Sequence, residues 1–299
     1  MLTKQEIKNK LKGTFSFDPT PDQEVFFSVF SDFLLCRQQP KAFLLRGFAG
    51  TGKTTLVTAI TSFVEANGYQ TLLMAPTGRA AKVMSGYSGK NAYTIHRSIY
   101  ARKPNAQGQT IITLAPNLFQ HAFFIVDEAG MIGSGPSVWP GSGKPRYLLD
   151  DLLEYTAMGT NCHLILCGDT AQLPPVGETF SAALSDDHLK KNYYLELFGT
   201  ELKNVVRQAE NSGILKNATR LRENLVTGEE YKPIGGDSDF RLLTGYEFTD
   251  EIEKAYSQYG HEGVCIVTRS NKRANQYNQQ VRNRLLYREN ALDAGDMMM

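Results

Sequence analysis

A glycine-rich segment at residues 47–55 has the residue types and spacing to bind a nucleoside triphosphate. Four residues separate Gly47 from Gly52, and Lys53 and Thr54 follow directly, which is the G-x-x-x-x-G-K-T spacing of a phosphate-binding P-loop. We expect Lys53 to reach the β- and γ-phosphates of ATP and the Thr54 hydroxyl to bind Mg²⁺. The expected nucleotide contacts in this loop are Gly47, Gly50, Thr51, Gly52, Lys53, Thr54 and Thr55.

Two carboxylates stand at the end of an apolar run further along the chain. Phe123–Val126 is followed by Asp127 and Glu128. Asp127 is expected to hold Mg²⁺ through its water shell, and Glu128 to orient or deprotonate the attacking water. The structural alternatives are a glycine-rich turn that binds nothing and a carboxylate pair that caps a turn. The presence of both motifs in one chain favours ATP hydrolysis.

The elements that position these residues follow from the apolar pattern. Short apolar runs at 42–45, 70–74, 123–126 and 163–167 alternate with helical patterns, such as Leu56, Ala59, Ile60 and Phe63 after the P-loop. Apolar runs of this length, separated by helices, are typical of the buried strands of a parallel sheet. The fold class is therefore α/β, a P-loop NTPase with helices flanking a parallel sheet.

Gln23 is the position with two competing interpretations. Thr20-Pro21-Asp22-Gln23 begins a helical pattern that includes Phe26, Phe30 and Phe33, so the Gln23 amide could close a capping box on Thr20. It could instead read the edge of an adenine beside the P-loop. The pattern alone favours the cap.

The composition is that of an ordinary globular protein and excludes several classes. The chain has 299 residues, 41% hydrophobic and 21% charged, with a net charge of +1, so any nucleic-acid surface must come from local clusters of Lys and Arg. No apolar stretch is long enough to span a membrane or serve as a signal peptide, so a cytoplasmic protein is expected. Cys162, Cys167 and Cys265 lie in apolar runs and are expected to be buried and reduced.

The domain organisation predicted from these patterns has two parts. Residues 1–198 form the ATP-binding domain, with a small β-hairpin inserted at about 97–120 that pairs Ser98–Ala101 with Ile111–Leu114. Residues 199–299 form a partial second domain. Its expected elements are helices at Ile214–Leu221, Phe248–Tyr259 and Asn271–Leu286 and strands at Phe240–Leu243 and Val264–Thr268.

The order of short motifs resembles that of superfamily 1 DNA helicases, most closely the Dda/RecD-like branch. The motifs are Gly47–Thr55, Ala75–Lys82, Thr94–His96, Asp127–Met131, Gly168–Val176, Val205–Gln208, Ser212–Leu215 and Thr268–Lys272 with Ala274 and Asn278. This resemblance implies two RecA-like domains with ATP between them and 5′-to-3′ movement on single-stranded DNA. It also implies a duplex junction as substrate, with the hairpin splitting the strands.

The resemblance further assigns roles to single residues. It makes Gln23 an adenine reader, Gln172 the sensor of the γ-phosphate and Arg207 an arginine finger. The positions that correspond to DNA contacts are Pro76, Thr77, Arg79, Thr94, His96, Thr268 and Asn271. Relatives in this superfamily carry two further motifs beyond the point where this chain stops, so the resemblance implies an incomplete second domain and weak activity.

One feature favours DNA without the resemblance. Residues 269–288 contain six Lys or Arg residues and no Asp or Glu, so they could line a phosphate track. They could equally form a solvated helix face. The alternatives to a helicase are a non-helicase P-loop ATPase and an ATP- and DNA-binding fragment without productive unwinding.

Overall fold

The computed structural model describes residues 2–104, 110–137, 145–204, 212–288, 290 and 293. The chain divides into two compact units, of which the first contains residues 1–211 and 218–229 and the second residues 212–217 and 230–299. Helix α8 (Gly213–Thr227) therefore contributes residues to both units.

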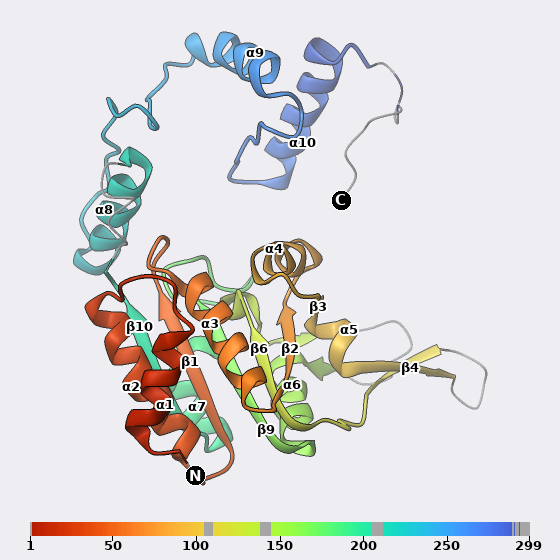
Figure 1. Ribbon diagram of the computed structural model, residues 1–299. Helices are drawn as coiled ribbons and strands as arrows, with labels where there is room; N and C mark the ends of the chain where they lie inside the picture. Colours follow the sequence, from red (N-terminus) through yellow and green to blue (C-terminus); the bar gives the residue numbers. More distant parts are fainter. Residues whose placement is uncertain are drawn as a thin grey trace. The chain divides into compact units, whose positions relative to one another are not determined.

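A parallel sheet forms the centre of the first unit (Figure 1). Its strands are β1 (Lys41–Gly47), β2 (Gln70–Ala75), β3 (Ala92–Thr94), β6 (Gln120–Val126), β9 (Thr160–Gly168) and β10 (Glu196–Leu202). The order across the sheet is β10-β1-β9-β6-β2-β3, and each neighbouring pair is parallel. The predicted α/β class with a parallel sheet is confirmed.

The apolar runs of the sequence are strands buried on both faces. Phe123 and Ile125 of β6 pack into one hydrophobic cluster, whereas Phe124 and Val126 pack into the other. Side chains alternate between the two faces of a strand, so a strand covered on both sides needs apolar residues at every position. This requirement explains why the sequence shows continuous apolar runs rather than alternation.

Helices cover both faces of the sheet (Figure 1). Residues of α1 (Lys4–Gly13), α2 (Pro21–Leu35), α3 (Lys53–Ala66) and α4 (Gly78–Ser88) pack in one cluster, and residues of α5 (Ile95–Ile99), α6 (Leu148–Met158) and α7 (Asp186–Tyr193) in the other. Aromatic rings fix α2 on β1, since the ring of Phe43 lies 5.2 Å from that of Phe30 and 5.6 Å from that of Phe33.

A small antiparallel hairpin projects from the first unit (Figure 1). Strands β4 (Tyr100–Pro104) and β5 (Thr110–Leu114) pair with Tyr100 opposite Leu114, which confirms the predicted insertion. Its first strand begins two residues later than expected because Ser98 belongs to α5. The turn at 105–109 lies outside the described residues. A second short pair joins β7 (Pro136–Ser137) to β8 (Arg146–Tyr147).

The second unit contains the first residues of α8, helix α9 (Glu247–Tyr259), helix α10 (Asn271–Gln280) and a π-helical turn at Val281–Leu285. The predicted helices are confirmed. The strands expected at 240–243 and 264–268 are wrong, since only an isolated bridge joins Asp237 to Phe240. A strand needs a neighbour for its backbone N–H and C=O groups, and the described residues of this unit offer none to 264–268. Cys265 is accordingly exposed, not buried.

The expected boundary near residue 199 falls inside β10, which pairs with β1 along residues 196–202. The first unit therefore extends beyond the predicted position. Within the described part of the chain, no helix is both long and apolar enough to cross a membrane.

Candidate nucleotide and nucleic-acid site

The predicted site residues of the first unit gather at one edge of the sheet. The P-loop follows β1, Asp169 follows β9, and Asp127 follows β6, and β9 lies between β1 and β6 in the sheet. Because these strands are parallel, their carboxyl ends meet at the same edge, where open α/β sheets bind ligands. Segments 40 to 120 residues apart in the chain thus converge.

The backbone of the P-loop requires its glycines. Gly50 and Gly52 have φ angles of 76° and 86°, in the left-handed region that side chains other than glycine disfavour. A Cβ atom on Gly47 would lie 2.8 Å from the Cβ of Leu202, so close packing against β10 excludes a larger residue there. Helix α3 begins at Lys53 with its free N–H groups directed at the loop, which favours an anion at this point.

Lys53 lies among three carboxylates. Its Nζ donates to the main-chain oxygens of Gly47 (2.7 Å) and Phe48 (2.9 Å). Burial lowers the pKa of Lys53, whereas Asp169, Asp127 and Glu128 act in the opposite direction. These carboxylates favour the charged form of the lysine, which is the form that binds phosphate.

Asp127 and Glu128 have different environments. The hydroxyl of Tyr87, on α4, donates to Oδ2 of Asp127 at 2.7 Å, and the N–H of Glu128 donates to Oδ1 at 2.9 Å. Glu128 has a φ angle of 52°, which turns it out of the strand direction at some conformational cost. Burial and the neighbouring Asp127 raise the pKa of Glu128, while a hydrogen bond with Gln172 lowers it. A raised pKa suits a carboxylate that accepts a proton from water.

Two residues of this edge were missed by sequence reasoning, Tyr87 and Arg222. Arg222 of α8 donates from Nη2 to both carboxylate oxygens of Asp169, and its guanidinium carbon lies 3.5 Å from the centroid of the Phe48 ring. No sequence motif marked either residue. A tyrosine at a helix end and one of several arginines in a helical pattern carry no local signal of what they contact.

Gln23 is the helix cap that the sequence pattern favours. Its Oε1 accepts from the N–H of Thr20 (2.9 Å), which closes the capping box, and its Nε2 donates to the main-chain oxygen of Thr51 (3.0 Å). The amide therefore joins the start of α2 to the P-loop. To read adenine it would have to exchange one of these two partners, and adenine recognition stays a prediction.

The segment that carries Arg207 lies outside the described residues, as do Val205–Gln208 as a whole. The chain enters this segment next to α2, because the N–H groups of Lys203 and Asn204 both donate to Oδ2 of Asp22 at 2.7 Å. The arginine-finger role stays a prediction.

The predicted DNA contacts of the first unit follow the next two strands of the same sheet. Thr77 and Thr94 are the N-cap residues of α4 and α5, and they follow the neighbouring parallel strands β2 and β3. Arg79 is exposed on the first turn of α4. His96 is half-buried on α5, and burial lowers its pKa. Pro76, Thr77, Arg79, Thr94 and His96 thus lie at adjoining strand ends beside the nucleotide residues.

The other two predicted DNA contacts belong to the second unit. The hydroxyl of Thr268 donates to the main-chain oxygen of Ser270 (3.1 Å), and Ser270 caps α10, which begins at Asn271. Asn271 is exposed at this helix N-terminus. The arrangement leaves N–H groups of the first turn open to a phosphate.

The described residues contain no cluster of three His, Cys, Asp or Glu side chains that could hold a metal ion. A Mg²⁺ ion in a P-loop site needs few protein ligands, because it keeps waters and binds phosphate oxygens. Thr54 is exposed at the second residue of α3, and each oxygen of Asp127 has one hydrogen bond, which leaves lone pairs available. These residues fit the group.

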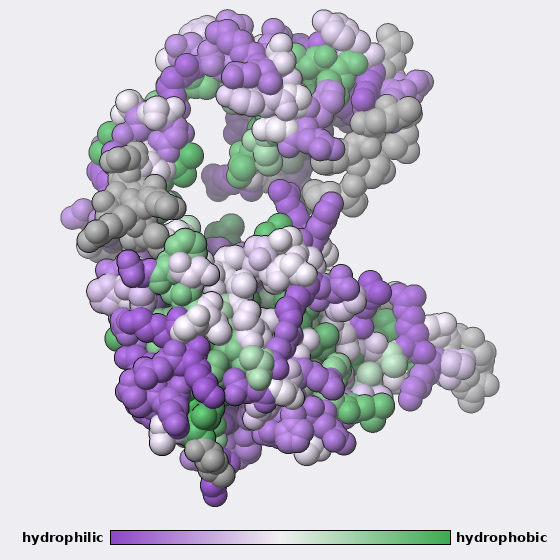
Figure 2. Space-filling view, in the orientation of Figure 1, coloured by the Kyte–Doolittle hydropathy of each residue, from purple (hydrophilic) through white to green (hydrophobic). Residues whose placement is uncertain are grey.

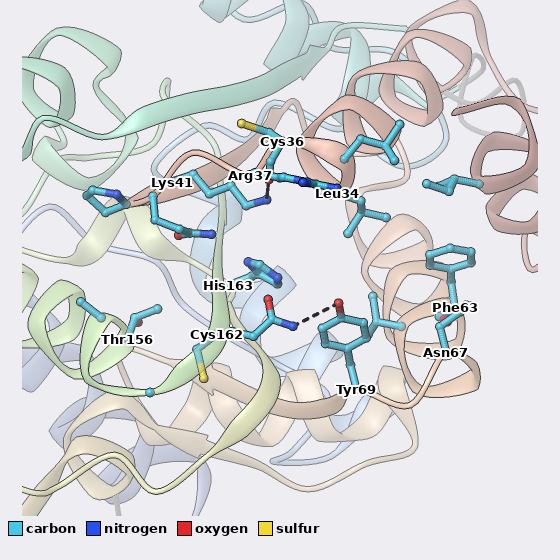
Figure 3. Close-up of a pocket in the computed structure, with 18 of the residues that line it drawn as sticks. Leu34, Cys36, Arg37, Lys41, Phe63, Asn67, Tyr69, Thr156, Cys162 and His163 are labelled. Carbon is cyan, nitrogen blue, oxygen red and sulfur yellow. Dashed lines mark hydrogen bonds between the residues drawn. The ribbon is translucent and has the colours of Figure 1, made fainter. Parts of the chain in front are cut away.

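A separate pocket of about 890 Å³ opens at the opposite edge of the sheet, where the strands begin (Figure 3). It is lined by the start of β1 and of β9, including Lys41 and His163, and by the ends of α2, α3 and α6. Lys41 donates to the main-chain oxygens of Phe33 and Cys36 at 2.6 and 2.5 Å, which stabilises the end of α2. No P-loop, Asp127 or Asp169 atom lines this pocket, so it is distinct from the nucleotide site.

Comparison with known proteins decides the family. Residues 34–232, two thirds of the chain, match the family model described as AAA domain. The chain belongs to this AAA domain family. The match covers the P-loop, both carboxylate motifs and all of α8.

The similar proteins are named as helicases. The ATP-dependent RecD2 DNA helicase of Deinococcus radiodurans is 28% identical over 67% of this chain and 25% of its own length. The ATP-dependent DNA helicase dda of Enterobacteria phage T4 is 28% identical over 85% of this chain and 55% of its own length. The chain thus spans about a quarter and about half of these relatives. Both belong to the helicase branch that the motifs resemble, which confirms the resemblance.

Among solved structures, the Pif1 helicase from Candida albicans matches with a TM-score of 0.46, at 19% identity, over 90% of this chain and 55% of its own.

Proposed function

We propose that the protein is an ATP-dependent DNA helicase or translocase that couples ATP hydrolysis to 5′-to-3′ movement on single-stranded DNA. The observation that carries the proposal is the convergence of the P-loop, Asp127-Glu128 and Asp169-Gln172 at neighbouring strand ends. A protein that only switches between nucleotide states would have no use for a glutamate of raised pKa beside Asp127. The names of the two curated relatives support DNA as the partner.

The residues divide the work of hydrolysis. The N–H groups of the P-loop hold the phosphates, and Lys53 leaves the carbonyls of Gly47 and Phe48 to bind them. Thr54 and Asp127 would hold Mg²⁺, which supplies positive charge to the phosphate oxygens. Glu128 would orient the attacking water and accept its proton, and Gln172 would sense the γ-phosphate. Arg207 would supply further positive charge in the transition state, a contribution of about 10³–10⁵ in rate in other NTPases.

The DNA-binding residues of the first unit would lie at the ends of β2 and β3, and those of the second unit at the start of α10. Pro76, Thr77, Arg79, Thr94 and His96 would contact the strand on the first unit, and Thr268 and Asn271 on the second. Figure 2 shows that hydrophilic residues cover much of the visible surface of the first unit. The hairpin β4–β5 is the candidate for the element that meets a duplex junction. A cytoplasmic location also stays a prediction.

The test separates ATP binding, hydrolysis and strand separation. Isothermal titration with a non-hydrolysable ATP analogue and Mg²⁺ should detect one site, which Lys53→Ala weakens and Glu128→Gln preserves. Hydrolysis should increase when single-stranded DNA is added, and the Glu128→Gln protein should lose it. A duplex with a 5′ single-stranded tail should be separated before one with a 3′ tail. Hydrolysis that does not respond to DNA would instead indicate a P-loop ATPase of another kind.

A further inference from the structure

Arg222 occupies a place in the nucleotide site that no motif of the sequence assigns. Its Nη2 donates to both carboxylate oxygens of Asp169, and its guanidinium plane covers the ring of Phe48 with 3.5 Å between the guanidinium carbon and the ring centroid. The side chains of Arg222 and Asp169 are only 18% and 6% exposed. Buried from water, the ion pair and the cation–π contact are both stronger than at a surface.

Asp169, which Arg222 holds in place, is hydrogen-bonded to the turn that follows it. Its Oδ1 accepts from the N–H of Ala171 at 2.9 Å, and its main-chain oxygen accepts from the N–H of Gln172 at 3.2 Å. These two bonds close the turn that carries Gln172, and the Gln172 side chain acts to lower the pKa of Glu128. The contacts of Arg222 therefore extend through Asp169 to the turn of Gln172.

Arg222 also sets the charge beside Lys53. Asp169 is the carboxylate that acts most strongly on Lys53. A buried carboxylate without a partner is costly, and the ion pair with Arg222 supplies that partner. Pairing Asp169 with Arg222 leaves the ammonium group of Lys53 free to bind phosphate.

We propose that Arg222 is a positioning residue of the ATP site. It holds the turn that carries Gln172 and the P-loop residue Phe48 in fixed positions relative to each other. This inference rests on the proposed ATP hydrolysis. Arg222 itself need not touch ATP. Its effect is transmitted by Asp169 on one side and by the Phe48 ring on the other.

The chain offers a matched control for an arginine of this kind. Arg146 donates to both oxygens of Asp151, which is 8% exposed, and lies 5.5 Å from the ring centroid of Tyr100. The chemistry is the same, an arginine between a buried aspartate and an aromatic ring, but its partners are α6 and β4. Arg146→Lys therefore reports the general cost of weakening such a pair in this unit.

The experiment compares Arg222→Lys, Phe48→Leu, their combination and Arg146→Lys. Lysine keeps a positive charge beside Asp169 but lacks the flat guanidinium that lies on the Phe48 ring. Arg222→Lys and Phe48→Leu therefore both lose the contact between these two side chains. Each should lower kcat for ATP hydrolysis by about tenfold or more, since small displacements of catalytic groups are costly, with a smaller change in the affinity for an ATP analogue. The double variant should lose little more than either single one. Amide hydrogen exchange in segment 168–173 should be faster in Arg222→Lys and in Phe48→Leu than in the parent protein.

Three outcomes would overturn the proposal: unchanged kcat and unchanged exchange of segment 168–173 in Arg222→Lys, full additivity of the two variants, or an equal loss of kcat in Arg146→Lys. A parent protein that does not hydrolyse ATP would refute the proposed function instead. The exchange of segment 168–173 and the affinity for the ATP analogue would then still decide whether Arg222 holds this site together.

Discussion

His163 should make the stability of the first unit depend on pH in a way that can be calculated. It lies on β9, the strand that ends in Gly168 before Asp169, and is 4% exposed. The rings of Phe33, Tyr69 and Phe123 lie 4.8 to 6.0 Å from its own, and its Nδ1 is buried without a hydrogen-bond partner in the described structure. Burial, with Lys41 and His121 nearby, lowers the pKa of His163 from 6.5 to about 4.

The direction in which stability changes with pH follows from the lowered pKa of His163. Above pH 6.5 the imidazole is neutral in both the folded and the unfolded chain, so its contribution to stability is fully present. As the pH falls below 6.5 only the unfolded chain takes up the proton, and stability is lost until the folded pKa near 4 is passed. A shift of about 2.5 units at 1.36 kcal/mol each gives a total loss of about 3 kcal/mol, of which about 2 kcal/mol falls between pH 7 and pH 5.

Urea unfolding followed by circular dichroism at pH 7, 6 and 5 measures this loss. His163→Phe keeps a ring among the aromatic neighbours and removes the titrating group. Its free energy of unfolding, relative to that of the parent, should therefore rise by about 2 kcal/mol between pH 7 and pH 5. Carboxylates titrate in both proteins and cancel in the comparison. His261 is exposed in the second unit, so His261→Gln serves as the control for a histidine removed outside the first unit. Parallel curves for His163→Phe and the parent would refute the assignment of a buried neutral imidazole.

Three further predictions concern the site. Glu128→Gln should lower kcat for ATP hydrolysis by about 10²-fold or more. In the parent protein, the acid limb of the kcat–pH profile should lie at a higher pH than an ordinary glutamate would give, because the pKa of Glu128 is raised. A limb at the ordinary position in steady-state assays would contradict this. Tyr87→Phe should raise the Mg²⁺ concentration at the midpoint of ATP-analogue binding several-fold, because Asp127 loses its 2.7 Å hydrogen bond. Titration with Mg²⁺ at a fixed concentration of the ATP analogue measures this midpoint. An unchanged midpoint would count against a metal role for Asp127. Arg79→Ala with Asn271→Ala should weaken binding of single-stranded DNA and reduce its salt dependence; fluorescence anisotropy over a salt series would show no change if the path is wrong.

The central sheet and its edge could be predicted because their determinants are local. A strand buried on both faces must be apolar throughout, as at residues 123–126, and the P-loop needs glycine at 50 and 52 for its positive φ angles. The hairpin at 100–114 was also predictable, since two short strand patterns flank a turn region. Each of these features is decided by residues next to one another in the chain.

The errors arise where the outcome depends on distant partners. Val264–Thr268 has the composition of a strand, but no described strand of its unit lies beside it to pair with. β10 was not predicted because its position at the edge of the first sheet comes from its pairing with β1, 155 residues earlier in the chain at Lys41–Glu196. Arg222 meets Asp169 across 53 residues and Phe48 across a larger separation, and nothing near residue 222 encodes either contact.

Arg222 lies on a helix whose residues are divided between the two units. Residues 218–227 of α8 belong to the first unit, whereas residues 213–217 of the same helix belong to the second. The helix that carries Arg222 to Asp169 therefore continues, without a break in its backbone hydrogen bonds, into residues whose own partners are Asp237 and Asp239 of the second unit. The start of the helix that carries Arg222 is thus held by residues of the second unit, and no residue near position 222 predicts its contact with Asp169.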